Sequence, residues 1–385
     1  MIHSADARQT QNAHNGTIGS EGSAESRPQS ARSRNRLYAQ LSLLLLVSVL
    51  CLAALEIGSR IFWRARGVPL RYPSRILYAY YPGLREIDQL RPSRTDDFYN
   101  ILFLGASTLN RAWGEVEPAL LERLGSNGYK KVRIFNLAEP AQTSRDSLLK
   151  YAALDSARFD LVIIYDGINE TRANNVPAKL FREDYGHYSW YEEVNTLAPY
   201  HGATSFVLPY TLRYLAVRAR QTLMHNRYVP TDRPREDWIE YGQTPRSAVS
   251  FKQNLGSILE LASQRGDPVL LMTFAIYVPK GYSLEAFKAK RLDYQLYSTP
   301  LEIWGRPEHV VATVAIHNEI VRNLAAHHAR TLFVDQAKLM VGSARYFNDA
   351  CHFTIEGSIS FVDNILQVVL PNIKSQWRGG GESHH

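Results

Sequence analysis

Three side chains that could together carry out acyl transfer through a serine nucleophile are spread widely along the chain. Ser107 follows the apolar run 99–104 and a Gly-Ala pair, and Asp349 precedes His352 by three residues. An Asp at that spacing can accept the Nδ1–H of the His, which leaves Nε2 to take a proton from a serine hydroxyl. Singly, each signal has a structural explanation, because Ser107 could cap a helix and Asp349 and His352 could form a surface pair. Taken together and in this order, the signals are much stronger than any one of them, and we predict that Ser107, Asp349 and His352 meet as a catalytic triad.

A fourth polar residue follows another apolar run. Asn169 comes shortly after residues 161–165 (LVIIY), and its side-chain N–H could stabilise a negatively charged oxygen beside the serine. The alternative is an Asn in a turn, where this residue type tolerates unusual backbone angles. Arg172, three residues later, is a candidate for contact with a polar substrate. Lone histidines are more often structural or surface groups, and we interpret four of them in this way: His187, His201, His225 and His317.

The elements that must position these residues alternate between apolar runs and helical patterns. Apolar runs predict strands over residues 99–104, 131–137, 161–165, 268–274 and 331–334. Helical spacing predicts helices over residues 114–127, 144–156, 248–265, 308–328 and 355–370. Strands that alternate with helices favour an α/β fold, here a three-layer α/β/α sandwich with a central, mostly parallel five-stranded sheet. Sites in such sheets form beyond the carboxyl ends of strands, where Ser107 and Asn169 are expected to lie.

Two irregular segments interrupt this alternation and are predicted to be insertions. Residues 172–246 are rich in Tyr, Pro, His and Arg, and residues 276–307 carry several Tyr and a Trp. Loops this long are usually functional lids or inserted helices. Their aromatic rings could stack on sugar rings, or could pack the insertions together. The predicted catalytic domain spans residues 97–372, after a connector over 58–96 and before a polar tail over 373–385.

The order and spacing of these segments resemble those of the SGNH hydrolase family, also called GDSL-type. The family's first block carries the nucleophile and falls on Ser107 in FLGAST. Its last block, Asp-x-x-His, is matched in full by Asp349 and His352. Its third block, Gly-x-Asn-Asp, falls on Asn169, with Glu170 in place of the Asp. The resemblance covers roughly residues 97–372, interrupted by the two insertions, and implies an SGNH or flavodoxin-like sheet.

The resemblance also implies how such a site would work. His352 would withdraw the Ser107 proton as Oγ attacks an ester carbonyl, and Asp349 would orient His352. The oxyanion would be held by the N–H groups of Ser107 and Ala141 and by the Asn169 side chain. Ala141 is a departure, since the family's second block normally supplies a Gly there, and a backbone donor survives this change unless the position needs a positive φ. No metal or organic cofactor is required by this chemistry.

The N-terminal part of the sequence predicts a membrane anchor. Residues 1–36 are polar and predicted to be disordered, whereas residues 37–57 centre on LSLLLLVSVLCLAAL. A stretch of about 20 apolar residues can cross a bilayer. A cleaved signal peptide is the alternative, but no A-x-A site follows the apolar run. Arginines flank both ends of it almost equally, so we base the orientation on the common arrangement of anchored hydrolases. We expect a single-pass inner-membrane protein with its N-terminus inside the cell and its catalytic domain outside the cytoplasm, in the periplasm.

Composition excludes several other classes of function. Lys and Arg are spread along the 385 residues, and a net charge of +7 without a basic cluster does not predict a nucleic-acid partner. The two cysteines, Cys51 and Cys351, are far apart in the chain and are not expected to pair. No CxxC or HExxH pattern predicts a metal site.

Three functions fit these observations. The favoured one is a membrane-anchored serine esterase that removes acyl groups, in particular acetyl, from a carbohydrate or cell-envelope glycan. The second is an O-acyltransferase that uses the same nucleophile on an exported polysaccharide. The third is a non-catalytic envelope protein that retains the fold, and the change at Ala141 is its only support. The predicted partners are therefore an ester substrate and the lipid bilayer.

Overall fold

The computed structural model describes residues 29–230, 233–342 and 344–376. The chain divides into two compact units, Met1–Leu55 and Glu56–His385. Most of the predicted polar tails, residues 1–28 and 377–385, lies outside the described residues. Helix α1 (Gln29–Arg64) begins within the segment predicted to be disordered and extends past the predicted end of the anchor. Its part Ser33–Arg64 contains an 18-residue window with a mean hydropathy of 2.4 and is long and apolar enough to cross a membrane, a property that signal sequences share.

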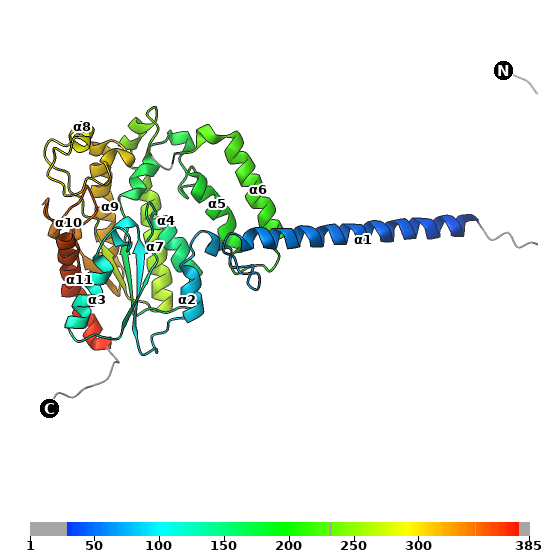
Figure 1. The fold of residues 1–385 in the computed structure, drawn as a ribbon, viewed down its shortest axis with the longest axis horizontal. Helices are drawn as coiled ribbons and strands as arrows, with labels where there is room; N and C mark the ends of the chain where they lie inside the picture. The colour runs from blue at the N-terminus through cyan, green and yellow to red at the C-terminus, as the bar shows by residue number, and fades with distance from the viewer. Residues whose placement is uncertain (1–28, 231–232, 343, 377–385) are drawn as a thin grey trace, which may run out of the picture. The chain divides into compact units, whose positions relative to one another are not determined.

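Within the described residues, the second unit is built on one parallel sheet of five strands (Figure 1). The strand order is β2-β1-β3-β4-β5, and every pair of neighbours is parallel. The sheet therefore confirms the predicted fold class. The strands are β1 (Tyr99–Gly105), β2 (Val132–Asn136), β3 (Leu161–Tyr165), β4 (Val269–Met272) and β5 (Thr331–Val334).

Helices cover both faces of this sheet. Helices α3 and α11 lie on one face and α4 and α7 on the other, with α9 against α7 (Figure 1). The helices after α1 are α2 (Leu84–Leu90), α3 (Val116–Ser126), α4 (Ser144–Ala153), α5 (Ser189–Leu197), α6 (Leu208–Leu223), α7 (Ser247–Arg265), α8 (Leu284–Lys288), α9 (Pro307–His327), α10 (Gln336–Leu339) and α11 (Ile355–Gln376). Helix α11 continues into the predicted C-terminal tail.

Strand β1 shows why the central strands read as continuous apolar runs. Ile101 and Phe103 belong to the core cluster under α3 and α11, whereas Leu102 and Leu104 belong to the cluster under α4 and α7. Successive side chains of a strand point to opposite faces, so a strand covered on both sides must be apolar at every position. The chain departs from β1 toward β2 on one side and toward β3 on the other, which places the switch point of the sheet between β1 and β3.

The two predicted insertions contain short helices and tightly packed aromatic rings. The first carries α5 and α6, and the ring of Tyr191 contacts the rings of Tyr185 and Tyr188. The second carries α8, where Phe287 and Tyr294 meet edge to face. Most of these rings therefore stabilise the insertions themselves.

The last residues of α1 belong to the second unit and pack against α6. Trp63 is 1% exposed, and its Nε1 donates to Thr211 Oγ1 at 2.9 Å. The Glu56 carboxylate accepts the backbone N–H groups of Val207 and Leu208, at 3.0 and 2.8 Å. These two N–H groups at the start of α6 have no partner within the helix, so Glu56 caps it.

Candidate active site

Ser107 lies just beyond the carboxyl end of β1, at the start of the short 3₁₀ helix η2 (Ser107–Leu109). Gly105, the last residue of β1, allows the chain to pass close to β3 just before Ser107. A Cβ at that position would lie 2.7 Å from the carbonyl oxygen of Tyr165 on β3, so a larger residue would push the two strands apart. The turn is tied to the loop after β2, because Asn110 Nδ2 donates to the Ala138 carbonyl at 2.7 Å. Ser107 thus lies at the switch point of the sheet.

Asp349 and His352 lie on a tight loop that is closed at both ends. Phe347 and Phe353 form an isolated antiparallel bridge across it. Between them, the Asn348 N–H donates to the His352 carbonyl at 2.8 Å, and the Asn348 side chain donates to the Phe353 carbonyl at 2.7 Å. The loop therefore holds the Asp and the His in one fixed arrangement.

The structure brings the three predicted triad residues together. His352 Nε2 lies 2.9 Å from Ser107 Oγ, and His352 Nδ1 lies 2.8 Å from Asp349 Oδ2. Asp349 is fully buried, and its Oδ1 also accepts the backbone N–H groups of Cys351 and His352, at 3.0 and 2.9 Å. These donors stabilise a carboxylate that accepts the Nδ1–H. Nε2 is then the imidazole nitrogen that can accept the serine proton.

Cys351 sits inside this loop but is not a competing nucleophile. Its Sγ lies 3.7 Å from His352 Nδ1. Burial, followed by the negative charge of Asp349, raises the pKa of the thiol well above its usual value, and a thiol is a poor nucleophile. Asp349, Cys351 and His352 also offer three ligand atoms within 4.8 Å of one another. Because the imidazole and the carboxylate bind each other and the thiol holds its proton, this group is poorly suited to a metal ion.

The Asn169 amide is oriented by two partners that sequence reasoning missed. Trp304 Nε1, which can only donate, lies 2.8 Å from Asn169 Oδ1. This fixes Nδ2 on the opposite side, where one of its hydrogens goes to the Gln142 carbonyl at 2.8 Å. The second hydrogen of Nδ2 remains for a substrate oxyanion. Trp304 and Gln142 lie far from Asn169 in the sequence, and no pattern in the sequence links them to it.

The backbone at Ala141 has the conformation that favours glycine. Its φ is +64°, in the left-handed region. The position therefore does need a positive φ, and the chain places an Ala there at a cost in strain. Among the described residues, the Ala141 N–H has no hydrogen-bond partner, so it can still serve as a donor. The departure from the family pattern affects stability more than the availability of the donor.

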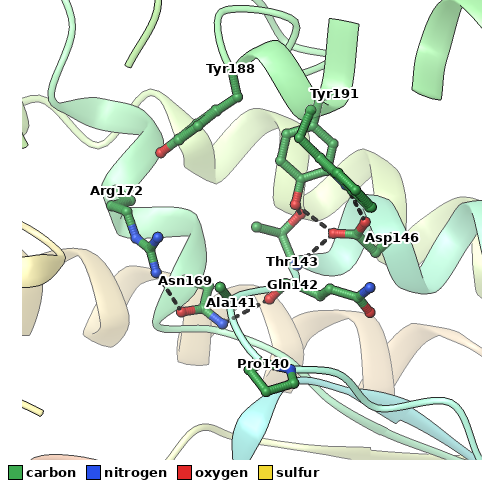
Figure 2. Close-up of a pocket in the computed structure, with 10 residues that line it drawn as sticks. Pro140, Ala141, Gln142, Thr143, Asp146, Asn169, Arg172, Tyr188 and Tyr191 are labelled. Atoms are coloured by element: carbon green, nitrogen blue, oxygen red, sulfur yellow. Dashed lines mark hydrogen bonds between the residues drawn. The ribbon is translucent and has the colours of Figure 1, made fainter. Parts of the chain in front are cut away.

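A cavity of about 260 Å³ adjoins Ala141 and Asn169 (Figure 2). Arg172, the candidate for substrate contact, lies on its wall and is 8% exposed, with Nη2 3.5 Å from Asn169 Oδ1. Tyr188, Trp190 and Tyr191 from the first insertion form the aromatic part of the wall. The cavity therefore lies next to the groups proposed to bind an oxyanion. Near the triad itself, the half-exposed Trp113 ring lies 4.9 Å from the His352 ring.

Buried ionisable side chains support the loop that carries Ala141. Lys150 Nζ donates to the Leu137 carbonyl and to Gln142 Oε1, both at 2.5 Å. Glu170 Oε1 accepts the Ser144 N–H at 2.5 Å, at the start of α4. Burial, followed by the charge of nearby Asp166, raises the pKa of the Glu170 carboxyl. The Glu that replaces the family's Asp is thus a buried, largely neutral group behind the site.

Of the other histidines considered from the sequence, His225 is exposed and the remaining three lie in structural settings. Burial lowers the pKa of His187, His201 and His317, each to about 4. His317 bridges the Gly167 carbonyl, at 3.0 Å, and the Ser247 hydroxyl, at 3.1 Å. These imidazoles are neutral hydrogen-bonding groups of the interior.

Comparison with known proteins yields matches among solved structures alone, since no protein-family model and no curated protein matches the chain. A GDSL-like lipase from Bacteroides thetaiotaomicron is 16% identical, with a TM-score of 0.40, covering 77% of this chain and 99% of that chain. A lipase/acylhydrolase from Enterococcus faecalis is 13% identical, with a TM-score of 0.39 and coverages of 74% and 99%. An acetyl xylan esterase from Geobacillus stearothermophilus is 14% identical, with a TM-score of 0.37 and coverages of 71% and 96%.

The chain resembles the SGNH hydrolases in the order of its motifs. The residues quoted for that resemblance, Ser107, Asn169 and the pair Asp349 and His352, follow the carboxyl ends of strands or lie on the loop before α11. Functional assignment rests on the geometry of these residues.

Proposed function

We propose that this protein is a serine ester hydrolase with Ser107, His352 and Asp349 as its catalytic triad. The observation that carries the proposal is the unbroken hydrogen-bonded chain from Ser107 Oγ through the imidazole to the buried carboxylate, with contacts of 2.9 and 2.8 Å. A non-catalytic protein would have no need to keep these three groups aligned. The intact chain therefore favours an enzyme over a binding protein that retains the fold.

The chemistry follows from the roles of these groups. His352 Nε2 takes the Ser107 proton as Oγ attacks the ester carbonyl, and Asp349 stabilises the imidazolium that forms. The N–H groups of Ser107 and Ala141 and the Asn169 amide bind the oxyanion. His352 then protonates the leaving alcohol, and a water molecule, deprotonated by His352, releases the acid and restores Ser107.

The proposed substrate is an acyl ester, in the first place an acetyl ester, of a carbohydrate or cell-envelope glycan. Support comes from the small cavity beside the oxyanion donors and from its aromatic wall, which offers flat faces to a sugar ring. The apolar helix α1 supports anchoring of the enzyme in a membrane, with the catalytic unit outside the cytoplasm. A glycan in the cell envelope is a substrate that such an anchor would bring within reach.

Hydrolysis of 4-nitrophenyl acetate by the purified full-length chain tests the proposal. Ser107→Ala should reduce kcat by about 10³-fold or more, since no nucleophile remains. The matched control is Ser126→Ala, at the exposed end of α3, which should retain the activity of the parent. Equal rates for the parent and Ser107→Ala would reject the triad.

A second assay separates hydrolysis from transfer, which differ only in the group that attacks the acyl-enzyme. The chain is incubated with an acetyl donor ester and an unacetylated glycan oligosaccharide, and the products are analysed by mass spectrometry. The proposed hydrolase gives free acetate. Acetylated oligosaccharide as the main product would instead identify an O-acyltransferase with the same nucleophile.

A further inference from the structure

The cavity beside the oxyanion donors holds a buried hydroxyl without a partner. Tyr188 is 7% exposed, and among the described residues its hydroxyl makes no hydrogen bond. A buried polar group left in this state destabilises the folded protein. Tyr188 also lines the cavity, and Figure 2 shows its ring extending toward Arg172. An unsatisfied donor on the wall of a cavity points to a ligand that would accept from it.

The charge next to this hydroxyl is positive. Arg172 lines the same cavity and is 8% exposed. Burial raises the pKa of the Tyr188 hydroxyl above its ordinary value; the guanidinium of Arg172 acts in the opposite direction, and the more weakly acting Glu170 in the same direction as burial. Tyr188 is therefore a neutral donor beside a cation. A guanidinium presents its N–H groups as a planar fork that matches a carboxylate.

Asp146, the acidic residue that lines the cavity, is occupied by other donors. Both oxygens of Asp146 are bonded: the hydroxyl of Tyr81 lies 2.7 Å from Oδ1, and that of Tyr191 lies 2.5 Å from Oδ2. Trp190 Nε1 and the Thr143 N–H add two further bonds to the same carboxylate, at 3.1 and 2.9 Å. These four donors disperse its negative charge, which leaves the Arg172 end of the cavity suited to an anion.

We propose that Arg172 and Tyr188 form a subsite for a carboxylate group carried by the ester substrate. The proposal rests on the function proposed above and narrows its substrate to anionic esters. The guanidinium binds the carboxylate, the hydroxyl donates a further hydrogen bond, and the partly exposed Trp190 ring flanks the bound group. The carboxylate can belong to the acyl part, as in a half-ester of a dicarboxylic acid, or to the alcohol part, as in an acylated uronic acid.

Two pairs of substrates distinguish these sources. The acyl pair is mono-4-nitrophenyl succinate and 4-nitrophenyl butyrate, and the alcohol pair is an O-acetylated methyl glucuronoside and the matching methyl glucoside. In one of the pairs, kcat/KM of the full-length chain should be at least tenfold higher for the anionic member. The ratio of anionic to neutral kcat/KM should fall about tenfold or more in Arg172→Gln and severalfold in Tyr188→Phe. Arg123→Gln, an exposed arginine of α3 paired with Asp363, controls for the lost charge.

Binding provides a readout that needs no turnover. Ser107→Ala is titrated with monomethyl succinate and with methyl glucuronoside in a calorimeter. One of them should bind, and its Kd should rise at least tenfold when Arg172→Gln is added. Rescue of part of the affinity by Arg172→Lys would support a charge contact.

The outcomes separate the two proposals. Ester hydrolysis without a preference for the anionic member of either pair would overturn the subsite, as would a ratio that is unchanged in Arg172→Gln. Failure of both ligands to bind Ser107→Ala would overturn it as well. Binding that depends on Arg172, in a parent chain that hydrolyses none of the four esters, would uphold the subsite and reject the hydrolase.

Discussion

Backbone conformation at Ala141 limits how the oxyanion site can be built. A positive φ costs a residue with a Cβ roughly 1–2 kcal/mol relative to glycine, and the φ of Ala141 is +64°. The strain is retained because the loop is held on both sides of Ala141. Lys150 binds the Leu137 carbonyl, and Asn169 binds the Gln142 carbonyl.

Ala141→Gly should therefore stabilise the protein by about 0.5–1 kcal/mol, after allowing for the greater entropy of glycine in the unfolded chain. Ester hydrolysis should persist, because the backbone N–H remains. The measurement is the free energy of unfolding in urea. Ala138→Gly, a buried position of the same loop without a positive φ, is the control and should destabilise the protein. A similar loss in both variants would show that strain at Ala141 is unimportant.

The positions of some site residues can be predicted from the sequence, whereas those of others cannot. Asp349 and His352 are three residues apart on one loop, so their pairing is local and could be predicted. Ser107 and Asn169 could be placed because each follows an apolar strand of a parallel sheet. Trp304, which fixes the Asn169 amide, and Tyr188, which reaches the same cavity, lie in irregular insertions. Their contacts depend on tertiary packing that no local periodicity records.

At the scale of elements, the start of α4 and the 3₁₀ helix η3 (Asn169–Asn174) are joined through a buried acid. Glu170 of η3 accepts the Ser144 N–H of α4, while its other oxygen has no partner among the described residues. The raised pKa of Glu170 means that the folded state binds a proton more tightly than the unfolded state does. Its contribution to stability is present below the unfolded pKa, near 4.5, and is lost as the pH rises through the folded pKa.

Glu170→Gln should remove this loss, because a neutral amide oxygen can still accept the Ser144 N–H. The variant should therefore gain stability relative to the parent as the pH increases from 5 to 9. Tm values of both proteins across that range provide the measurement. Asp166, whose pKa is also raised by burial, remains in both proteins, so the difference between them reports Glu170 together with its effect on Asp166. If the Tm advantage of Glu170→Gln over the parent became smaller as the pH rises, the raised pKa assigned to Glu170 would be contradicted.

The strands and the long helices could be predicted as elements because their patterns are strong. All five strands and the helices that cover the sheet lie within a few residues of their expected positions, for example β3 over Leu161–Tyr165. The insertions lack such periodicity, and their helices α5, α6 and α8 are held by aromatic and hydrogen-bonded contacts specific to this fold. The sequence indicates that these segments are irregular, but it does not predict where their helices lie against the rest of the fold.

For the whole molecule, the catalytic unit begins inside the long helix rather than after it. The sequence suggests a connector from residue 58, but the structure buries Trp63 against α6 and caps that helix with Glu56. A shortened chain that starts at residue 68 would lose both contacts. A chain that starts at Glu56 would retain them and is the better form for study in solution.

Trp63→Ala should destabilise the full-length protein by about 3–5 kcal/mol, since it empties a buried site and leaves the Thr211 hydroxyl without its donor. Trp113→Ala, at a half-exposed tryptophan, is the matched control and should cost much less. Chemical denaturation followed by circular dichroism measures both values. Equal small effects would mean that the end of α1 does not belong to the catalytic unit.

The central claim is that one imidazole activates one serine hydroxyl, and covalent labelling tests it most directly. The full-length chain is treated with a fluorophosphonate probe, digested, and mapped by peptide mass spectrometry. We predict a single adduct on Ser107, absent in Ser107→Ala and formed at least 100-fold more slowly in His352→Ala. An unlabelled Ser107 in the folded protein, or labelling at an unchanged rate without His352, would contradict the account.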